Sequence, residues 1–227
     1  MPENNLEPPK GNASDAVHLA ARAIISAVPG FGGPALELFN ATIIPPLEKR
    51  RNEWMQHIAQ VLKQLQECKV NVEELKNNEA FIDAVIKASR IAIADTQKEK
   101  IEALKNAITH SALPGSPDKS LQQVFFNYVD TFTVFHLRIL DLFSQQDKLN
   151  SFQQNGIDPD VDAFINFEIP ELAHENELTR FVWTDLNTKG LLKGGQLGIV
   201  PRGRGYLVIK HTTDFGDKFL SFIRKPT

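Results

Sequence analysis

Residues 45–69 read PPLEKRRNEWMQHIAQVLKQLQECK, and this stretch decides the class of fold. Two prolines open it, at positions where the first turn of a helix tolerates a missing N–H, and no glycine or further proline follows. Its apolar residues recur at three-, four- and seven-residue intervals, which mark one face of an amphipathic helix: Leu47, Trp54, Ile58, Val61, Leu65 and Cys68. The stretch therefore predicts the longest helix of the chain, with one side packed and Cys68 acting as a small buried hydrophobe.

Two segments after this helix continue the helical pattern. Asn78 is placed to cap a helix with a wider apolar face, formed by Phe81, Ile82, Val85, Ile86 and Ile93. A further helix over residues 96–112 is expected to bury three residues, Ile101, Leu104 and Ile108. Because only short connections separate these amphipathic segments, we expect an antiparallel helical bundle over residues 13–112.

The chain before residue 45 is rich in helix breakers. Residues 1–12 predict a disordered tail, and the helix that follows is expected to stop at Pro29. Residues 23–47 place many apolar side chains around breakers, and two interpretations stay open: two short core helices, or a hairpin that leaves the bundle to lie on a membrane or a partner. The uncharged run over residues 23–36 is too short to span a membrane.

The second half begins after a breaker-rich segment, Leu113-Pro-Gly-Ser-Pro-Asp118, which we interpret as a domain boundary. Two helices are expected next, around residues 121–129 and 135–143. Charge then separates along the chain, because residues 144–177 carry a net −7 and residues 178–227 a net +6. The overall net charge of −3 conceals this division.

One segment of the chain has the alternating pattern that is typical of a pair of β-strands. Residues 198–202 and 205–209 flank a basic, glycine-punctuated turn at Arg202-Gly203-Arg204-Gly205 and predict a β-hairpin over 198–209. A terminal helix opening at Thr213 follows, and its apolar residues are Phe215, Phe219, Leu220, Phe222 and Ile223.

This order of parts resembles a winged-helix domain of the multiple-antibiotic-resistance regulator type. The run Leu178-Thr-Arg-Phe-Val-Trp-Thr-Asp-Leu-Asn-Thr-Lys-Gly-Leu-Leu192 is similar to its recognition helix, Arg204-Gly-Tyr-Leu-Val-Ile209 to a wing strand, and Thr213-Asp-Phe-Gly-Asp-Lys-Phe219 to its closing helix. The resemblance covers roughly residues 130–224.

We therefore expect a mainly α protein: an N-terminal antiparallel helical bundle followed by a winged-helix-like domain with one β-hairpin over residues 118–227. Proteins of this type are usually homodimers.

The resemblance also implies which side chains would read DNA, through the helix at 175–189 and the wing at 198–209. These side chains are Arg180, Thr184, Asn187, Lys189, Arg202 and Arg204. The same helix carries Glu175, Glu177 and Asp185, which oppose binding to phosphates. Packing, or contact with an acidic protein surface, is therefore an equal interpretation of this helix and wing.

The first half loosely resembles bacterial helical proteins grouped with abortive-infection families, which act in phage defence. The likeness lies in Ala27-Val-Pro-Gly-Phe-Gly-Gly-Pro-Ala-Leu-Glu-Leu-Phe39, followed by Pro45-Pro-Leu-Glu-Lys-Arg-Arg51. It implies a cytosolic accessory or effector protein and brings no catalytic residues with it.

The residue types needed for catalysis are not arranged in any familiar pattern. The glycine-rich runs lack the Gly-Lys-Ser/Thr of a phosphate loop, and Glu171-Leu-Ala-His174 has no second Glu-x-x-His to complete a di-iron site. His136 falls in an apolar helix, where a packed, hydrogen-bonded imidazole is more plausible than a general base. We therefore predict no enzyme activity, no cofactor and no metal.

Composition places the protein in a reducing compartment. The chain has 227 residues, 42% of them hydrophobic and 23% charged, and a single cysteine, so the cytoplasm is the expected location. The leading hypothesis is a non-enzymatic bacterial interaction or effector protein that contacts an unidentified protein partner or DNA. The alternative is a DNA-binding transcriptional regulator.

Overall fold

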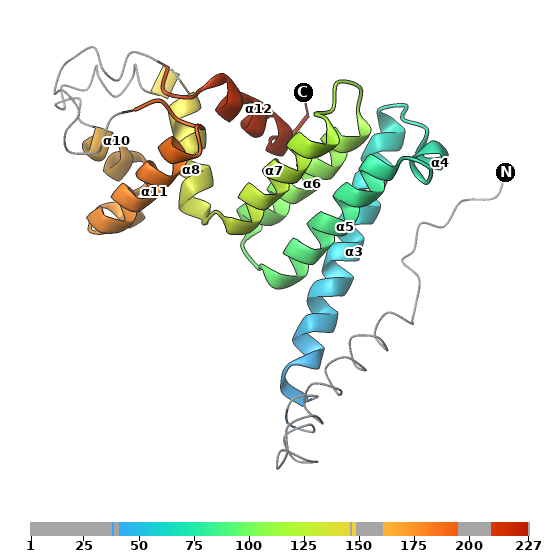
Figure 1. Cartoon of the computed structure of the whole chain (residues 1–227). Coiled ribbons are helices and arrows are strands. Elements are labelled where there is room, and N and C mark those ends of the chain that lie inside the picture. The colour runs from blue at the N-terminus through green and yellow to red at the C-terminus, as the bar shows by residue number, and fades with distance from the viewer. Residues whose placement is uncertain (1–37, 39–40, 146, 149–160, 195–209, 227) are drawn as a thin grey trace. The chain divides into compact units, whose positions relative to one another are not determined.

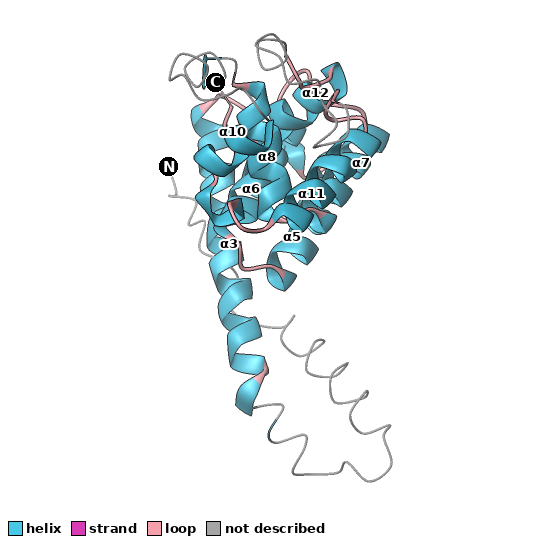
Figure 2. Ribbon diagram, turned by 90° about the vertical axis from the view of Figure 1, so that its left-hand side faces the viewer, coloured by secondary structure: helices cyan, strands magenta, loops and turns pink. Residues whose placement is uncertain are grey.

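The computed structural model describes residue 38 and residues 41–145, 147–148, 161–194 and 210–226 (Figure 1). Within these ranges the chain is mainly helical and divides into two compact units, Met1–Pro117 and Asp118–Thr227. Helices and loops account for all of the described ribbon in Figure 2. Among the described helices, none combines the length and apolar character that crossing a membrane requires.

The first unit contains four described helices, whose ends follow local signals in the sequence. They are α3 (Ile44–Glu67), α4 (Val72–Leu75), α5 (Glu79–Ala94) and α6 (Lys98–Ala112). Helix α3 begins at the two prolines and ends before Lys69, whose φ of 63° turns the chain away. The side chain of Asn78 accepts a hydrogen bond from the backbone N–H of Phe81 at 3.1 Å, so the predicted cap of α5 is confirmed.

The stripe on α3 forms the core of this unit. Trp54, Ile58, Val61 and Leu65 are buried, as predicted, and α3 packs against both α5 and α6. The indole N–H of Trp54 donates to the hydroxyl of Ser89 at 2.8 Å, which satisfies its polar atom inside the core. The prediction for Cys68 is wrong: this residue is exposed, because α3 has already ended and Cys68 is its C-cap.

The apolar face predicted for α5 is buried only in part. Phe81 is buried, but Ile82 is 38% exposed and Ile86 is 62% exposed. The buried side of α5 consists mainly of small residues, which face the small residues of α6: Ala84, Ala88 and Ala92 on α5, and Ala103 and Ala107 on α6. Small side chains let two helix backbones approach closely, and this turns the larger isoleucines outward.

The second unit contains α7 (Lys119–Thr131), α8 (Val134–Ser144), α10 (Val161–Glu168), the short 3₁₀ helix η1 (Pro170–Leu172), α11 (Asn176–Thr188) and α12 (Asp214–Ile223). Helix α8 contacts both α11 and α12. The core is rich in aromatic rings, and the ring of Phe125 lies 5.4–5.5 Å from three rings of α12, those of Phe215, Phe219 and Phe222. Helices α11 and α12 agree with the helices predicted at 175–189 and from Thr213 onward.

The expectation of a winged-helix domain with a β-hairpin is wrong for the part of the chain that the structure describes. These residues contain no β-strand; there is one isolated antiparallel bridge between Leu192 and Thr212. On one side the bridge is bounded by the helices, because Gly190, with a φ of 70°, ends α11 and Thr213 caps α12. On the other side the contact extends only to the hydrogen bond from the Lys193 N–H to the His211 carbonyl at 2.7 Å. The predicted hairpin over 198–209 lies outside the described residues, as does the predicted tail over 1–12.

Candidate interaction surface

The outward side of α11 is the most distinctive surface of the second unit. Helix α11 buries Val182, Trp183 and Leu186 against the core. Its opposite side presents five exposed residues, which we call the α11 face: Glu177, Arg180, Phe181, Thr184 and Thr188. Phe181 is 60% exposed. An exposed aromatic ring on a helix whose other side is buried is a common anchor for a partner.

A column of aromatic rings lies beneath Phe181. The ring of Tyr128 stacks on Phe132 with centroids 5.1 Å apart, and Phe132 stacks on His136 at 4.8 Å with the planes 3° from parallel. The ring of Phe181 meets His136 edge-on, at 5.9 Å and 89°. Because His136 itself is buried, Phe181 rests on a packed support.

Hydrogen bonds at Nδ1 fix the ring of His136 in this column. The backbone N–H of Thr133 donates to Nδ1 at 3.1 Å, and the Thr133 hydroxyl lies 2.9 Å from the same nitrogen. Nδ1 is therefore an acceptor, which puts the proton of the neutral imidazole on Nε2, 3.4 Å from a carboxylate oxygen of Asp185. The packed, hydrogen-bonded histidine predicted from the sequence is confirmed.

A hydroxyl, an imidazole and a carboxylate in this order also occur in nucleophilic active sites. Here the Nδ1 lone pair that would take the proton of Thr133 already accepts a backbone N–H. The Thr133 oxygen in turn accepts the backbone N–H of His136, as the cap of α8. The arrangement thus closes a capping box and supports the aromatic column.

Asp185 connects this column to the end of α11. Its second carboxylate oxygen forms an ion pair with Lys189 at 3.0 Å. Burial raises the pKa of the nearby Tyr128 phenol, with Lys189 opposing the rise and Asp185 adding to it. The phenol is therefore neutral at physiological pH and acts as a packed ring with a polar tip.

The side chains predicted to read DNA separate into three groups. Arg180 and Thr184 lie one helical turn apart on the α11 face. Asn187 donates to the Trp183 carbonyl and accepts from the Gly194 N–H, both at 2.8 Å, so it closes the end of the helix, while Lys189 is paired with Asp185. The other two, Arg202 and Arg204, lie outside the described residues.

Phe181 was not among the predicted site residues, although the sequence contained a signal for it. It lies four residues after Glu177 and three before Thr184, which is the spacing of one helix face. A large aromatic residue on an otherwise polar face is the pattern that marks it.

A cleft lies in the first unit. This cleft has a volume of about 500 Å³ and ten lining residues: Arg50, Glu53, Trp54, His57, Ala92, Asp95, Thr96, Lys98, Ile101 and Glu102. Asp95, one of these residues, forms an ion pair with the buried Lys100, with 2.8 Å between carboxylate oxygen and ammonium nitrogen. Burial alone would raise the pKa of Asp95, but the hydrogen bonds from Lys100 and the Gln97 N–H outweigh it and lower that pKa.

Across the described residues, no three His, Cys, Asp or Glu side chains come together in a way that would hold a metal ion. Comparison of the chain with protein-family models, with curated proteins and with solved structures finds no match. The resemblances drawn from the sequence therefore gain no support from known proteins.

Proposed function

We propose that this protein is a non-enzymatic interaction protein that binds a protein partner through the α11 face, with Phe181 as the anchor. The single observation that carries the proposal is the 60% exposure of a phenylalanine supported by a buried aromatic column. Aromatic residues dominate the binding energy of protein interfaces, and a ring held on a rigid helix loses little entropy on binding.

The residues around Phe181 favour a protein over DNA. The α11 face has one cation, Arg180, and one carboxylate, Glu177, so its formal charge cancels. A DNA-binding helix gains most of its affinity from cations that neutralise phosphates, and Lys189 is already paired with Asp185. A mixed polar rim around an aromatic centre is the usual composition of a protein interface.

The DNA-binding regulator remains the second candidate. It is supported by Arg180 and Thr184, which lie on one face of α11 within reach of a common ligand. This function predicts a gel shift that weakens steeply with salt and is reduced by Arg180→Ala.

The test compares two exposed phenylalanines of the same unit. Tagged full-length parent, Phe181→Ala and Phe167→Ala proteins would be used to capture partners from the native host, with quantitative mass spectrometry and then calorimetry on the purified pair. Phe167 on α10 is 55% exposed and serves as the matched control. We expect a partner that is lost with Phe181→Ala and retained with Phe167→Ala.

All three proteins should keep the same helix content by circular dichroism, and Phe181→Ala should lower the free energy of unfolding by no more than about 1.5 kcal/mol, because it gives up one ring contact with His136. The proposal is refuted if every captured protein binds Phe181→Ala as well as it binds the parent. A salt-dependent gel shift that needs Arg180 and not Phe181 would favour the regulator instead.

A further inference from the structure

The cleft of the first unit lies where α3, the end of α5 and the start of α6 meet. The residues that each long helix contributes are spaced by three and four positions, so they share one face of that helix: Arg50, Glu53, Trp54 and His57 on α3, and Lys98, Ile101 and Glu102 on α6. The end of α5 and the connection after it close the cleft. Its volume of about 500 Å³ is typical of a site for a small molecule.

The apolar part of the lining is held in place by the core. The ring of Trp54 is only 2% exposed, and its indole N–H donates to the hydroxyl of Ser89 at 2.8 Å. The ring of His57 meets Trp54 at 6.2 Å and 64°. Ile101 of α6 and Ala92 of α5 add further apolar surface. A ligand therefore meets a surface that is already ordered, which lowers the entropy cost of binding.

The carboxylates of the cleft are already neutralised. Each forms an ion pair with a lysine that is not part of the lining. The pairs and their oxygen–nitrogen distances are Asp95 with Lys100 at 2.8 Å, Glu102 with Lys105 at 2.9 Å, and Glu53 with Lys49 at 3.9 Å. A cationic ligand would have to compete with these lysines.

The cations of the cleft are in the opposite situation. Within the part of the chain that the structure describes, the side chains of Arg50 and Lys98 form no ion pair, although Arg50 is partly buried. When the three paired lysines are counted with the lining, the cleft has two positive charges in excess. An excess of positive charge in a cleft attracts an anion, and a guanidinium group fits a carboxylate or a phosphate with two hydrogen bonds.

We propose that this cleft binds a small organic anion, with its carboxylate or phosphate on Arg50 and Lys98 and a flat apolar body against Trp54 and Ile101. An inorganic anion would leave the apolar lining in contact with water, and an uncharged apolar molecule would leave the two cations without a counter-charge. The organic anion is the ligand that satisfies both parts of the lining. This site is separate from the α11 face, which belongs to the other unit.

The test follows the indole N–H signals of the full chain by nuclear magnetic resonance during titration. The probes are naphthoate, naphthyl phosphate and the uncharged naphthalenemethanol, which share one ring system. The chain has two tryptophans, and Trp183 lies in the other unit, so its signal is an internal control. Ser89→Ala assigns the Trp54 signal, because it removes the acceptor of that N–H. We expect naphthoate or naphthyl phosphate to shift the Trp54 signal alone, and naphthalenemethanol to bind at least roughly tenfold more weakly.

Three variants test the contacts to the anion. Arg50→Ala and Lys98→Ala should each raise the dissociation constant of the anionic probe by roughly tenfold, the usual effect of losing a hydrogen bond to a charged group. Arg51→Ala is the matched control, because Arg51 is the neighbour of Arg50 and does not line the cleft, and it should bind like the parent. Circular dichroism should show the helix content of the parent in all three.

Three results would overturn the proposal. The first is a Trp54 signal that neither anionic probe shifts at about 10 mM, a concentration that fills most of a site whose dissociation constant is about 1 mM. The second is an uncharged probe that binds as tightly as the anionic ones. The third is equal binding of the anionic probe by Arg50→Ala, Lys98→Ala and Arg51→Ala.

Discussion

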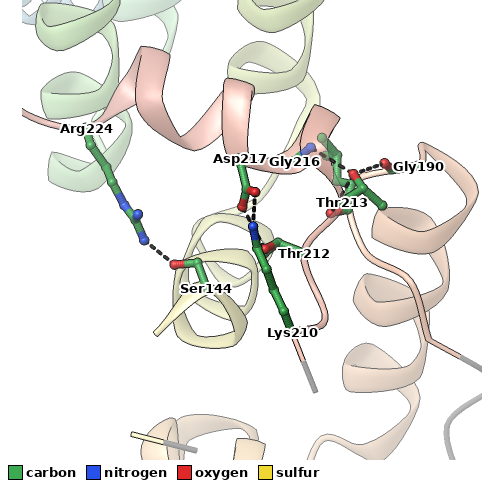
Figure 3. Close-up of polar contacts among 9 residues, drawn as sticks. Ser144, Gly190, Lys210, Thr212, Thr213, Gly216, Asp217 and Arg224 are labelled. Carbon is green, nitrogen blue, oxygen red and sulfur yellow. Dashed lines mark hydrogen bonds and ion pairs between the residues drawn. The ribbon is translucent and has the colours of Figure 1, made fainter. Parts of the chain in front are cut away.

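The backbone of Gly216 lies directly against the carbonyl oxygen of Leu191, so that a Cβ added at Gly216 would approach this oxygen to 2.2 Å. Thr213 fastens the same two segments: its hydroxyl donates to the Gly190 carbonyl at 2.6 Å (Figure 3), and its N–H donates to the Leu191 carbonyl at 3.1 Å. The first turn of α12 is thus docked on the chain that follows α11. Position 216 therefore requires glycine because a side chain would not fit there. The φ of Gly216 is not positive, so backbone conformation is not the reason.

The substitution Gly216→Ala should therefore destabilise the protein by about 1–3 kcal/mol, the usual cost of forcing an extra methyl group into a packed site. Urea unfolding followed by circular dichroism measures this loss. Ser221→Ala is the matched control, because Ser221 is exposed on the same helix, and its effect should stay within about 0.5 kcal/mol. Equal stability of Gly216→Ala and the parent would show that α12 does not dock on Leu191 as described.

The stripe on α3 supports a second prediction. Ile58→Ala and Leu65→Ala should each lower the free energy of unfolding by about 2–5 kcal/mol, because each leaves a cavity in the core of the first unit. Ile86→Ala removes the same atoms as Ile58→Ala from an exposed position and should cost far less. If Ile58→Ala and Ile86→Ala were equally mild, the core would lie elsewhere.

The ion pair between Asp95 and Lys100 supports a third prediction. The Lys100 side chain is only 5% exposed, so Asp95→Asn leaves a buried ammonium without its carboxylate. The expected loss at neutral pH is about 1–3 kcal/mol, and chemical unfolding measures it. Glu73→Gln, which removes the carboxylate of an exposed pair with Lys76, should cost no more than about 1 kcal/mol.

A fourth prediction concerns the stability of the protein at low pH. Burial alone would raise the pKa of Asp217, but hydrogen bonds from Lys210 and Thr212 outweigh it and lower that pKa. A carboxyl group whose pKa is lower in the folded state stabilises the protein above its unfolded pKa, about 4, and loses this contribution as pH falls through the folded value. Asp217→Asn should therefore be less stable than the parent at pH 7, and the difference should shrink in strong acid.

The measurement for Asp217 is the free energy of unfolding of parent and Asp217→Asn as a function of pH. Asp214→Asn is the control on the same helix, because Asp214 is exposed in the first turn of α12 and its loss should cost no more than about 1 kcal/mol at pH 7. A gap between parent and Asp217→Asn that stayed constant from pH 7 into strong acid would contradict the assignment.

The fifth prediction rests on the sequence alone, because Arg202 and Arg204 lie outside the described residues. If these arginines contact an anionic partner, the double change Arg202→Ala, Arg204→Ala weakens that binding and leaves the melting temperature nearly unchanged, since exposed ion pairs contribute about 0–1 kcal/mol. If they instead fold back on the acidic residues 158–177, the double variant is destabilised, and high salt destabilises the parent in the same way. Thermal melts at low and high salt distinguish the two.

The positions of several helices were predictable because their start signals are local. Pro45 and Pro46, Asn78 and Thr213 each act on backbone groups within the next few residues, so α3, α5 and α12 begin where these residues indicate. The buried stripe of α3 was also predictable, because its apolar residues lie on one side and its polar residues on the other.

The buried side of α5 was decided by the tertiary structure. Apolar residues surround much of this helix, so periodicity alone favoured the large isoleucines. The choice depends on how closely α6 approaches, and Ala103 and Ala107 on α6 select Ala84 and Ala88 as the inner face. The exposure of Ile82 and Ile86 follows from that distant contact between two helices.

The candidate surface on α11 was likewise predictable only in part from the sequence. Its helix and the exposure of Arg180 and Thr184 follow from local spacing, which the sequence by itself determines. The tertiary structure decided that Asn187 and Lys189 hold the end of the helix and that His136 supports Phe181. These roles depend on which groups are brought together from distant parts of the chain, and hydrogen bonds, ion pairs and ring contacts form only once folding has placed those groups within a few ångströms.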